Sequence, residues 1–109
     1  MIDEKPEAQE KTQYRSLITE FMDFDDNPVK VVVRFRKPST AVCDRTVKEM
    51  NKSAGKAFRN LLFALVHPDD KATLDEAIEQ YPGVSITFAN ELLERSGFSA
   101  EVVNKLGKP

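Results

Sequence analysis

The chain has 109 residues, of which 40% are hydrophobic and 31% are charged, as expected for one small globular domain with a well-solvated surface. Its 16 basic and 18 acidic side chains leave a net charge of −2, whereas a dedicated nucleic-acid-binding protein normally carries a strong basic excess. One cysteine, Cys43, excludes an internal disulfide and is typical of a reducing cytoplasm. The longest apolar run, residues 61–66, is far shorter than the ~20 residues of a membrane span. We therefore expect a cytoplasmic protein with no membrane partner.

The N-terminal part of the chain begins with polar and charged residues. Residues 1–12 predict a flexible leader, and residues 13–107 a single, mostly helical domain. Four apolar residues then follow at spacings of i, i+3, i+4 and i+7, which predicts a short helix: Tyr14, Leu17, Ile18 and Phe21. A strand is the rival interpretation, because Leu17, Thr19 and Phe21 also alternate.

A turn at residues 25–28 precedes the clearest element, a β-branched strand over residues 29–36. One face of this strand is apolar: Val29, Val31, Val33 and Phe35. A lone strand leaves its backbone donors and acceptors unpaired, so it needs a partner strand. Two partners are open: a hairpin with residues 16–24, or the same strand of a second copy. In the second case Val31, Val33 and Phe35 would form a self-association strand.

The remainder of the chain predicts helices joined by short turns. Ser39 or Thr40 and then Ser53 suit N-cap positions, Pro68 suits a first helical turn, and Gly97 suits the position after a helix end. The predicted helices cover about residues 39–51, 53–66, 68–81, 84–95 and 99–106. The expected fold class is therefore α+β and mostly α: a bundle of four to five short helices with one strong N-terminal strand.

The sequence offers no set of residues for catalysis. One histidine and one cysteine cannot supply the three or four protein ligands of a zinc site. The acidic stretch 23–27 fails as a calcium loop, because Pro28 stands where glycine must turn the chain and Arg34 where the bidentate Glu belongs. No glycine-rich loop or base–nucleophile pair is visible. We expect no enzyme, no cofactor and no bound metal.

Two predicted helices carry more apolar surface than one buried stripe requires. Residues that extend past a single stripe predict a groove for a protein partner, although an ordinary core is the competing interpretation. The candidate partner-binding residues are Phe58, Leu62, Phe63, Val84, Ile86, Phe88, Leu92 and Leu93.

A local basic cluster accompanies the strand: Lys30, Arg34, Arg36 and Lys37. With Phe35 between them, these cations suit phosphates and base stacking. The bland interpretation is an edge strand kept soluble by charges on its outer face, and the surrounding acidic residues favour it.

Several short motifs occur in a fixed order. They are Val33-Arg34-Phe35-Arg36-Lys37-Pro38-Ser39-Thr40, then Arg59-Asn60-Leu61-Leu62, Leu65-Val66-His67-Pro68-Asp69-Asp70 with Leu74, Tyr81-Pro82-Gly83, and Glu91-Leu92-Leu93. Over about residues 28–97 the chain thereby resembles the small tail assembly chaperones of long-tailed bacteriophages and prophages, including related uncharacterised phage proteins.

The resemblance implies a non-enzymatic role in the cytoplasm of a bacterial host. Such chaperones bind the long tape measure protein, or a related tail component, and keep it soluble until the tail tube assembles around it. This family offers no catalytic residues that could be assigned to positions of the chain. Self-association into a homo-oligomer along the client is also implied. The alternative is a small DNA-associated regulator of a phage or bacterium that uses the basic strand 30–37.

Overall fold

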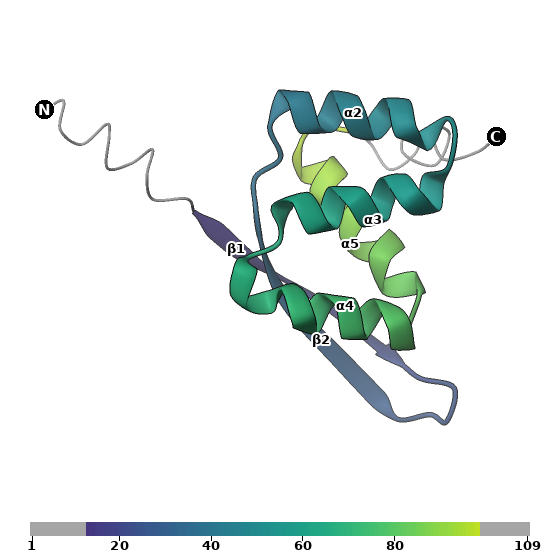
Figure 1. Ribbon diagram of the computed structural model, residues 1–109. Coiled ribbons are helices and arrows are strands. Elements are labelled where there is room, and N and C mark those ends of the chain that lie inside the picture. The colour runs from purple at the N-terminus through teal and green to yellow at the C-terminus, as the bar shows by residue number, and fades with distance from the viewer. Residues whose placement is uncertain (1–12, 99–109) are drawn as a thin grey trace, which may run out of the picture.

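The computed structural model describes residues 13–98, which form a two-stranded antiparallel sheet and four α-helices with one short 3-10 helix. Figure 1 shows the strands as one long hairpin, with the helices gathered on one side of it. The α+β, mostly α fold class is confirmed. The predicted leader 1–12 and the predicted last helix 99–106 lie outside the described residues.

The hairpin consists of β1 (Tyr14–Met22) and β2 (Pro28–Arg36). Leu17 stands opposite Val33, and Ile18 stands opposite Val32. The turn between the strands is held by Asp23, whose Oδ1 accepts from the backbone N–H of Asp25 at 2.9 Å and of Asn27 at 2.8 Å. The clear strand therefore finds its partner within the same chain, as the hairpin alternative predicted.

The helix predicted around residues 14–21 is wrong, because this segment is the strand β1. Its apolar residues fit a helical spacing, but pairing with β2 satisfies the backbone and selects a period of two. Leu17 consequently faces the helices and is buried, whereas Ile18 lies on the opposite face of the sheet and is half exposed.

The helices are α2 (Thr40–Met50), α3 (Ala54–Leu65), α4 (Lys71–Gln80) and α5 (Gly83–Arg95), with the 3-10 turn η1 (Pro68–Asp70) before α4. Their boundaries agree with the predicted signals. The side chains of Ser39 and Ser53 each accept a backbone N–H in the first turn of α2 and α3. Pro68 opens η1, where its missing N–H is not needed.

The end of α5 confirms the prediction for Gly97. This residue has a φ of 103°, which a glycine adopts without a Cβ clash. The N–H of Gly97 donates to the carbonyl of Glu94, and the N–H of Phe98 donates to that of Leu93. This pair of bonds is a Schellman motif, and it returns Phe98 to pack against the core.

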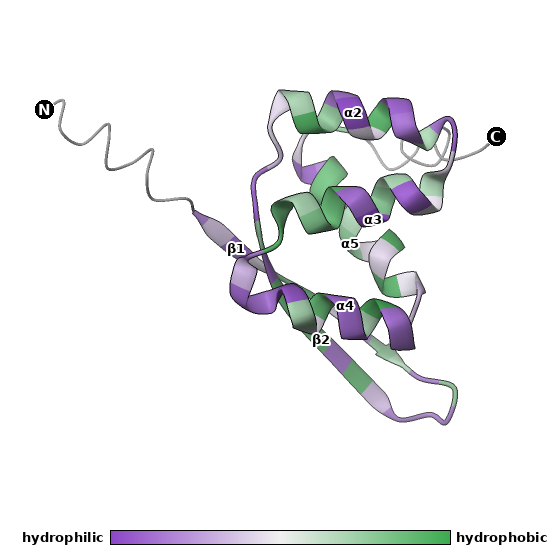
Figure 2. Cartoon of the chain, viewed as in Figure 1, coloured by the Kyte–Doolittle hydropathy of each residue, from purple (hydrophilic) through white to green (hydrophobic). Residues whose placement is uncertain are grey.

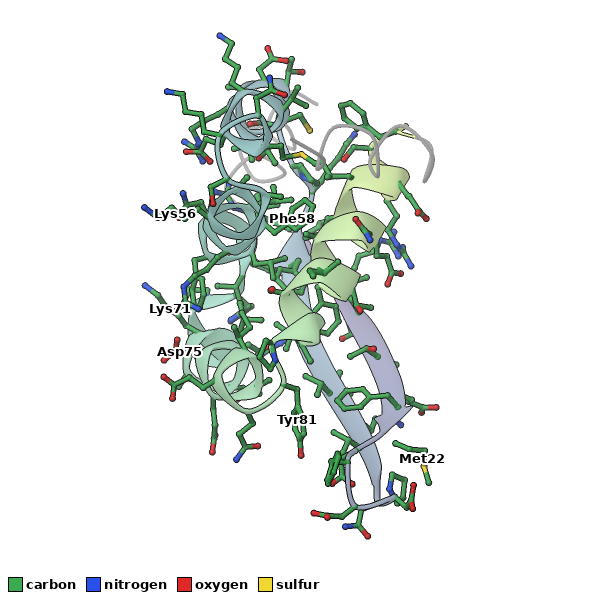
Figure 3. All side chains as sticks on the ribbon, turned by 90° about the vertical axis from the view of Figure 1, so that its right-hand side faces the viewer. Met22, Lys56, Phe58, Lys71, Asp75 and Tyr81 are labelled. Carbon is green, nitrogen blue, oxygen red and sulfur yellow. The ribbon has the colours of Figure 1, made fainter. Side chains whose placement is uncertain are left out.

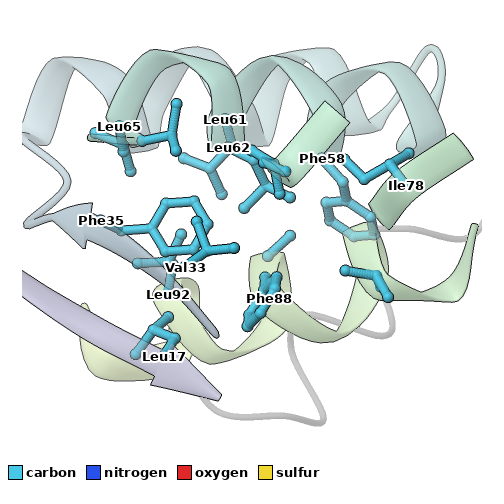
Figure 4. Packing of buried hydrophobic residues seen from close by; sticks show 14 of the residues in the cluster. Leu17, Val33, Phe35, Phe58, Leu61, Leu62, Leu65, Ile78, Phe88 and Leu92 are labelled. Atoms are coloured by element: carbon cyan, nitrogen blue, oxygen red, sulfur yellow. The ribbon is translucent and has the colours of Figure 1, made fainter. Parts of the chain in front are cut away.

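One hydrophobic core joins the inner face of the hairpin to the helices (Figure 4). Figure 2 shows hydrophobic and hydrophilic bands alternating along β2, as a strand with one covered face requires. Leu17, Val33 and Phe35 supply the sheet side of the core. The Phe35 ring lies 5.4 Å from that of Phe88 in α5, centroid to centroid. The packing of α5 and α3 over the inner face of the hairpin therefore sets the arrangement of the strands and helices.

Candidate partner-binding surface on the hairpin

Most of the predicted partner-binding residues belong to this core and not to a surface. Six of the eight are at most 6% exposed: Phe58, Leu62, Val84, Phe88, Leu92 and Leu93. They are buried because α5 packs across both α3 and β1, so its two apolar stripes are covered from different directions. The predicted groove between helices is therefore wrong for these six residues.

The other two predicted residues remain at the surface to different degrees. Phe63 is partly buried, and the Arg59 guanidinium lies over its ring at 5.0 Å. Ile86 is 49% exposed on α5. A single exposed isoleucine on a helix is ordinary for a soluble domain, so these two positions do not form a groove.

The predicted self-association strand is also corrected. Val31, Val33 and Phe35 are buried under the helices, and β2 is bonded on both of its edges near its end. One edge pairs with β1, and at the other Phe35 bridges to Val66. There the N–H of His67 donates to the carbonyl of Arg34 at 2.9 Å. A second copy therefore cannot pair with this part of β2.

An ion pair locks the same edge. Asp70 accepts three bonds from Arg34, each 2.9 Å long: one from the backbone N–H, one from Nε and one from Nη2. The side-chain bonds from Arg34, followed by its backbone N–H, lower the pKa of the Asp70 carboxyl to about 2. The same hydrogen bond raises the pKa of the Arg34 guanidinium. Asp70 thus holds η1 against β2.

The outer edge of β1, in contrast, is open within residues 13–98. The backbone groups of Arg34 point away from β1, so its partner Ser16 also points its own groups away from β2. By alternation Ile18 and Glu20 do the same. The described part of the sheet has two strands only, and no described hydrogen bond reaches these outward groups. They present unpaired donors and acceptors to an added strand.

An apolar pair lies beside this open edge, on the face of the hairpin that the helices leave uncovered. Ile18 is 51% exposed and its direct partner Val32 is 43% exposed. The next pair along the same face is Glu20 with Lys30. Met22 and Phe24 extend the apolar surface toward the turn, and Figure 3 shows Met22 at the end of the hairpin that projects past the helices.

The predicted basic patch is divided by the fold. Arg34 is bonded to Asp70, and Lys30 stands opposite Glu20. Arg36 donates from Nη2 to the Ala64 carbonyl at 3.0 Å. Arg36 and Lys37 instead line a cleft at the other end of the hairpin. The four cations therefore do not form one continuous phosphate-binding stripe.

Among residues 13–98 no group of three or more potential metal ligands comes together. No helix in this range is long and apolar enough to cross a membrane.

Comparison with known proteins identifies the family. Residues 8–105 match the family described as "Domain of unknown function (DUF6848)", and the chain belongs to it. A solved structure, that of the uncharacterised protein rbstp2171 from Bacillus stearothermophilus, is similar with a TM-score of 0.67 and 26% sequence identity. The similarity covers 87% of this chain and 93% of that one. No curated protein matches.

Proposed function

We propose that the protein is a non-enzymatic tail assembly chaperone of a phage or prophage, which binds an extended segment of a tape-measure-type client on its hairpin. The observation that carries this proposal is the open edge of β1 beside the exposed Ile18–Val32 pair. The order of motifs that resembles tail assembly chaperones supports the choice of client. The host cytoplasm, where such a client is synthesised, is the proposed location.

Binding occurs by addition of a third strand. The client backbone bonds to the outward groups of Ser16, Ile18 and Glu20, which gives affinity without requiring a particular sequence. Apolar client side chains on the outer face pack against Ile18 and are withdrawn from water. An unfolded client has both unpaired backbone and exposed apolar side chains, so this surface covers the two features that cause aggregation.

The test is co-expression with a tape-measure-type protein, the proposed class of client. Wild-type protein should keep that client soluble, and Ile18→Lys should lose most of this effect because a lysine opposes both strand addition and apolar packing. The matched control is Ile86→Lys, which places the same charge at an equally exposed isoleucine on α5. It should protect the client as well as wild type does.

A second variant addresses the backbone hydrogen bonds of the β1 edge. Glu20→Pro removes an N–H that points to solvent, a position where an edge strand tolerates proline, and it should also abolish protection. Circular dichroism and urea unfolding identify variants that remain folded. Full protection by folded Ile18→Lys and Glu20→Pro would reject the hairpin as the client site.

The alternative function, DNA-associated regulation through Lys30, Arg34, Arg36 and Lys37, is tested in parallel. Duplex DNA binding that falls steeply with added salt would favour it, because cation–phosphate contacts release counterions. The division of these four residues leads us to expect no retention of DNA at low salt.

A further inference from the structure

A cleft opens at the end of the hairpin opposite to the turn. It lies between the start of β1, the end of β2 and the last turns of α5, and has a volume of about 440 Å³. Its floor is apolar and comes from four buried residues: Leu17, Phe35 and Leu92 from β1, β2 and α5, and Pro38 from the connection between β2 and α2. This volume accommodates one or two side chains of a partner.

The rim of the cleft is cationic. Four basic side chains line it, from three different segments of the chain: Arg15, Arg36, Lys37 and Arg95. No acidic residue is among those that line it, although the chain as a whole carries a net charge of −2. The local charge is therefore opposite to that of the molecule.

The four cations differ in what they already bind. Arg95 pairs with Glu91 at 2.8 Å, and Arg36 bonds to the Ala64 carbonyl. Arg15 and Lys37 form no ion pair with any residue from 13 to 98. These two side chains hold the charge available to a ligand.

We infer that this cleft is a docking pocket for an acidic client segment, in which an apolar side chain enters the cleft and flanking carboxylates meet Arg15 and Lys37. The inference rests on the proposed strand addition, since Arg15 and Leu17 belong to β1. A strand added along β1 sets alternate side chains beside Arg15 and Leu17 on the inner face. It thereby specifies the chemistry of the client: an aliphatic or aromatic residue between acidic residues.

The floor favours a peptide over a nucleic acid. Phe35 is 2% exposed and already packs against Phe88, so its ring offers no free face for a base to stack on. Leu17, Pro38 and Leu92 are also buried, and they contribute aliphatic atoms to the cleft wall, which suits contact with a leucine or phenylalanine side chain. The cationic rim then serves carboxylates and not a long run of phosphates.

The experiment uses the full chain, uniformly labelled with ¹⁵N, and three blocked heptapeptides built on threonine and valine. The first has a central leucine with glutamates two positions before and after it, so that the three side chains share one face of a strand. The second has lysines in place of the glutamates, and the third keeps the glutamates around a central serine. The first should shift the amide signals of residues 13–17, 35–37 and 92–95. The other two peptides should bind at least about tenfold more weakly than the first.

A double variant, Arg15→Gln with Lys37→Gln, should weaken the first peptide about tenfold. The control is Lys30→Gln, which removes a cation from the far end of the same hairpin and should change nothing. Absence of shifts at millimolar peptide, equal binding of the lysine peptide, or tighter binding of single-stranded DNA each overturns the inference. If the double variant still protects the client while Ile18→Lys does not, the cleft inference fails and the strand-addition proposal stands.

Discussion

The two faces of the hairpin have opposite environments although they are built from alternate residues of the same two strands. The inner face carries Leu17, Val33 and Phe35, which are buried beneath α3 and α5. The outer face carries Ile18 and Val32 at adjacent positions of the same strands, and both are about half exposed. Similar side chains thus stabilise the fold on one face and are available to a partner on the other.

This difference shows that apolar character alone does not locate a binding surface. Burial is decided by which face of the sheet the helices cover, and the helices described between residues 40 and 95 cover one face (Figure 3). A two-stranded sheet with one face packed is stable as part of a larger core. Within residues 13–98 the other face is not covered by helices, so an interaction there would cost the fold little stability.

The largest effect should come from comparing adjacent residues of β1. Leu17→Ala should lower the free energy of unfolding by about 2–4 kcal/mol, since it leaves a cavity in the core. Ile18→Ala should lower it by less than about 1 kcal/mol, because this side chain is half solvated already. Urea denaturation at neutral pH measures both values. Equal losses would contradict the assignment of the two faces.

The next effect concerns the tie between β2 and η1. Asp70→Asn weakens the hydrogen bonds to Arg34 and should lower the free energy of unfolding by about 1–2 kcal/mol at pH 7. The pKa of Asp70 is lowered from 3.8 to about 2 in the folded protein. Its contribution is therefore complete above pH 3.8 and is lost as the pH falls toward 2.

Acid titration of stability checks this assignment. Wild-type protein should lose stability between pH 4 and pH 2 more steeply than Asp70→Asn does. The control is Asp75→Asn, which removes the partner of Arg59 in an ion pair whose two side chains are about half exposed. Such a pair contributes little, so this variant should keep the wild-type slope.

The smallest effect is expected at the hairpin turn. Asp23→Ala removes the acceptor of two backbone N–H groups and should reduce stability by about 1 kcal/mol. Asp23→Asn keeps a side-chain oxygen in place and should retain most of that stability. Thermal unfolding of the two variants separates the loss of the acceptor from the loss of charge.

Much of the helical region could be predicted from the sequence because its signals are local. Ser39 and Ser53 cap the turn that follows each of them, and Gly97 ends α5 three residues after Glu94, whose carbonyl accepts its N–H. The strand β2 was equally clear from its β-branched residues. For β1 the local spacing favoured a helix, and pairing with β2 overrode it.

The candidate surface was harder to predict because burial is a property of the assembled fold. Phe88 and Leu93 sit on different sides of α5, and both are covered because that helix is central. No spacing within α5 reveals this. For the outer face the sequence offers one indication of an exposed apolar position, Val32. It is the apolar residue on a strand face that otherwise carries Lys30, Arg34 and Arg36. Its partner Ile18 became visible only once the register was known.

The tie of Asp70 to Arg34 also limits how many copies could ever join through their sheets. Because η1 occupies the far side of β2 at its end, only the β1 edge is open at that end of the hairpin. Two molecules that meet there through β1 would use both open edges and form a symmetric pair. Such a pair leaves no strand edge for a third copy at that end of the hairpin.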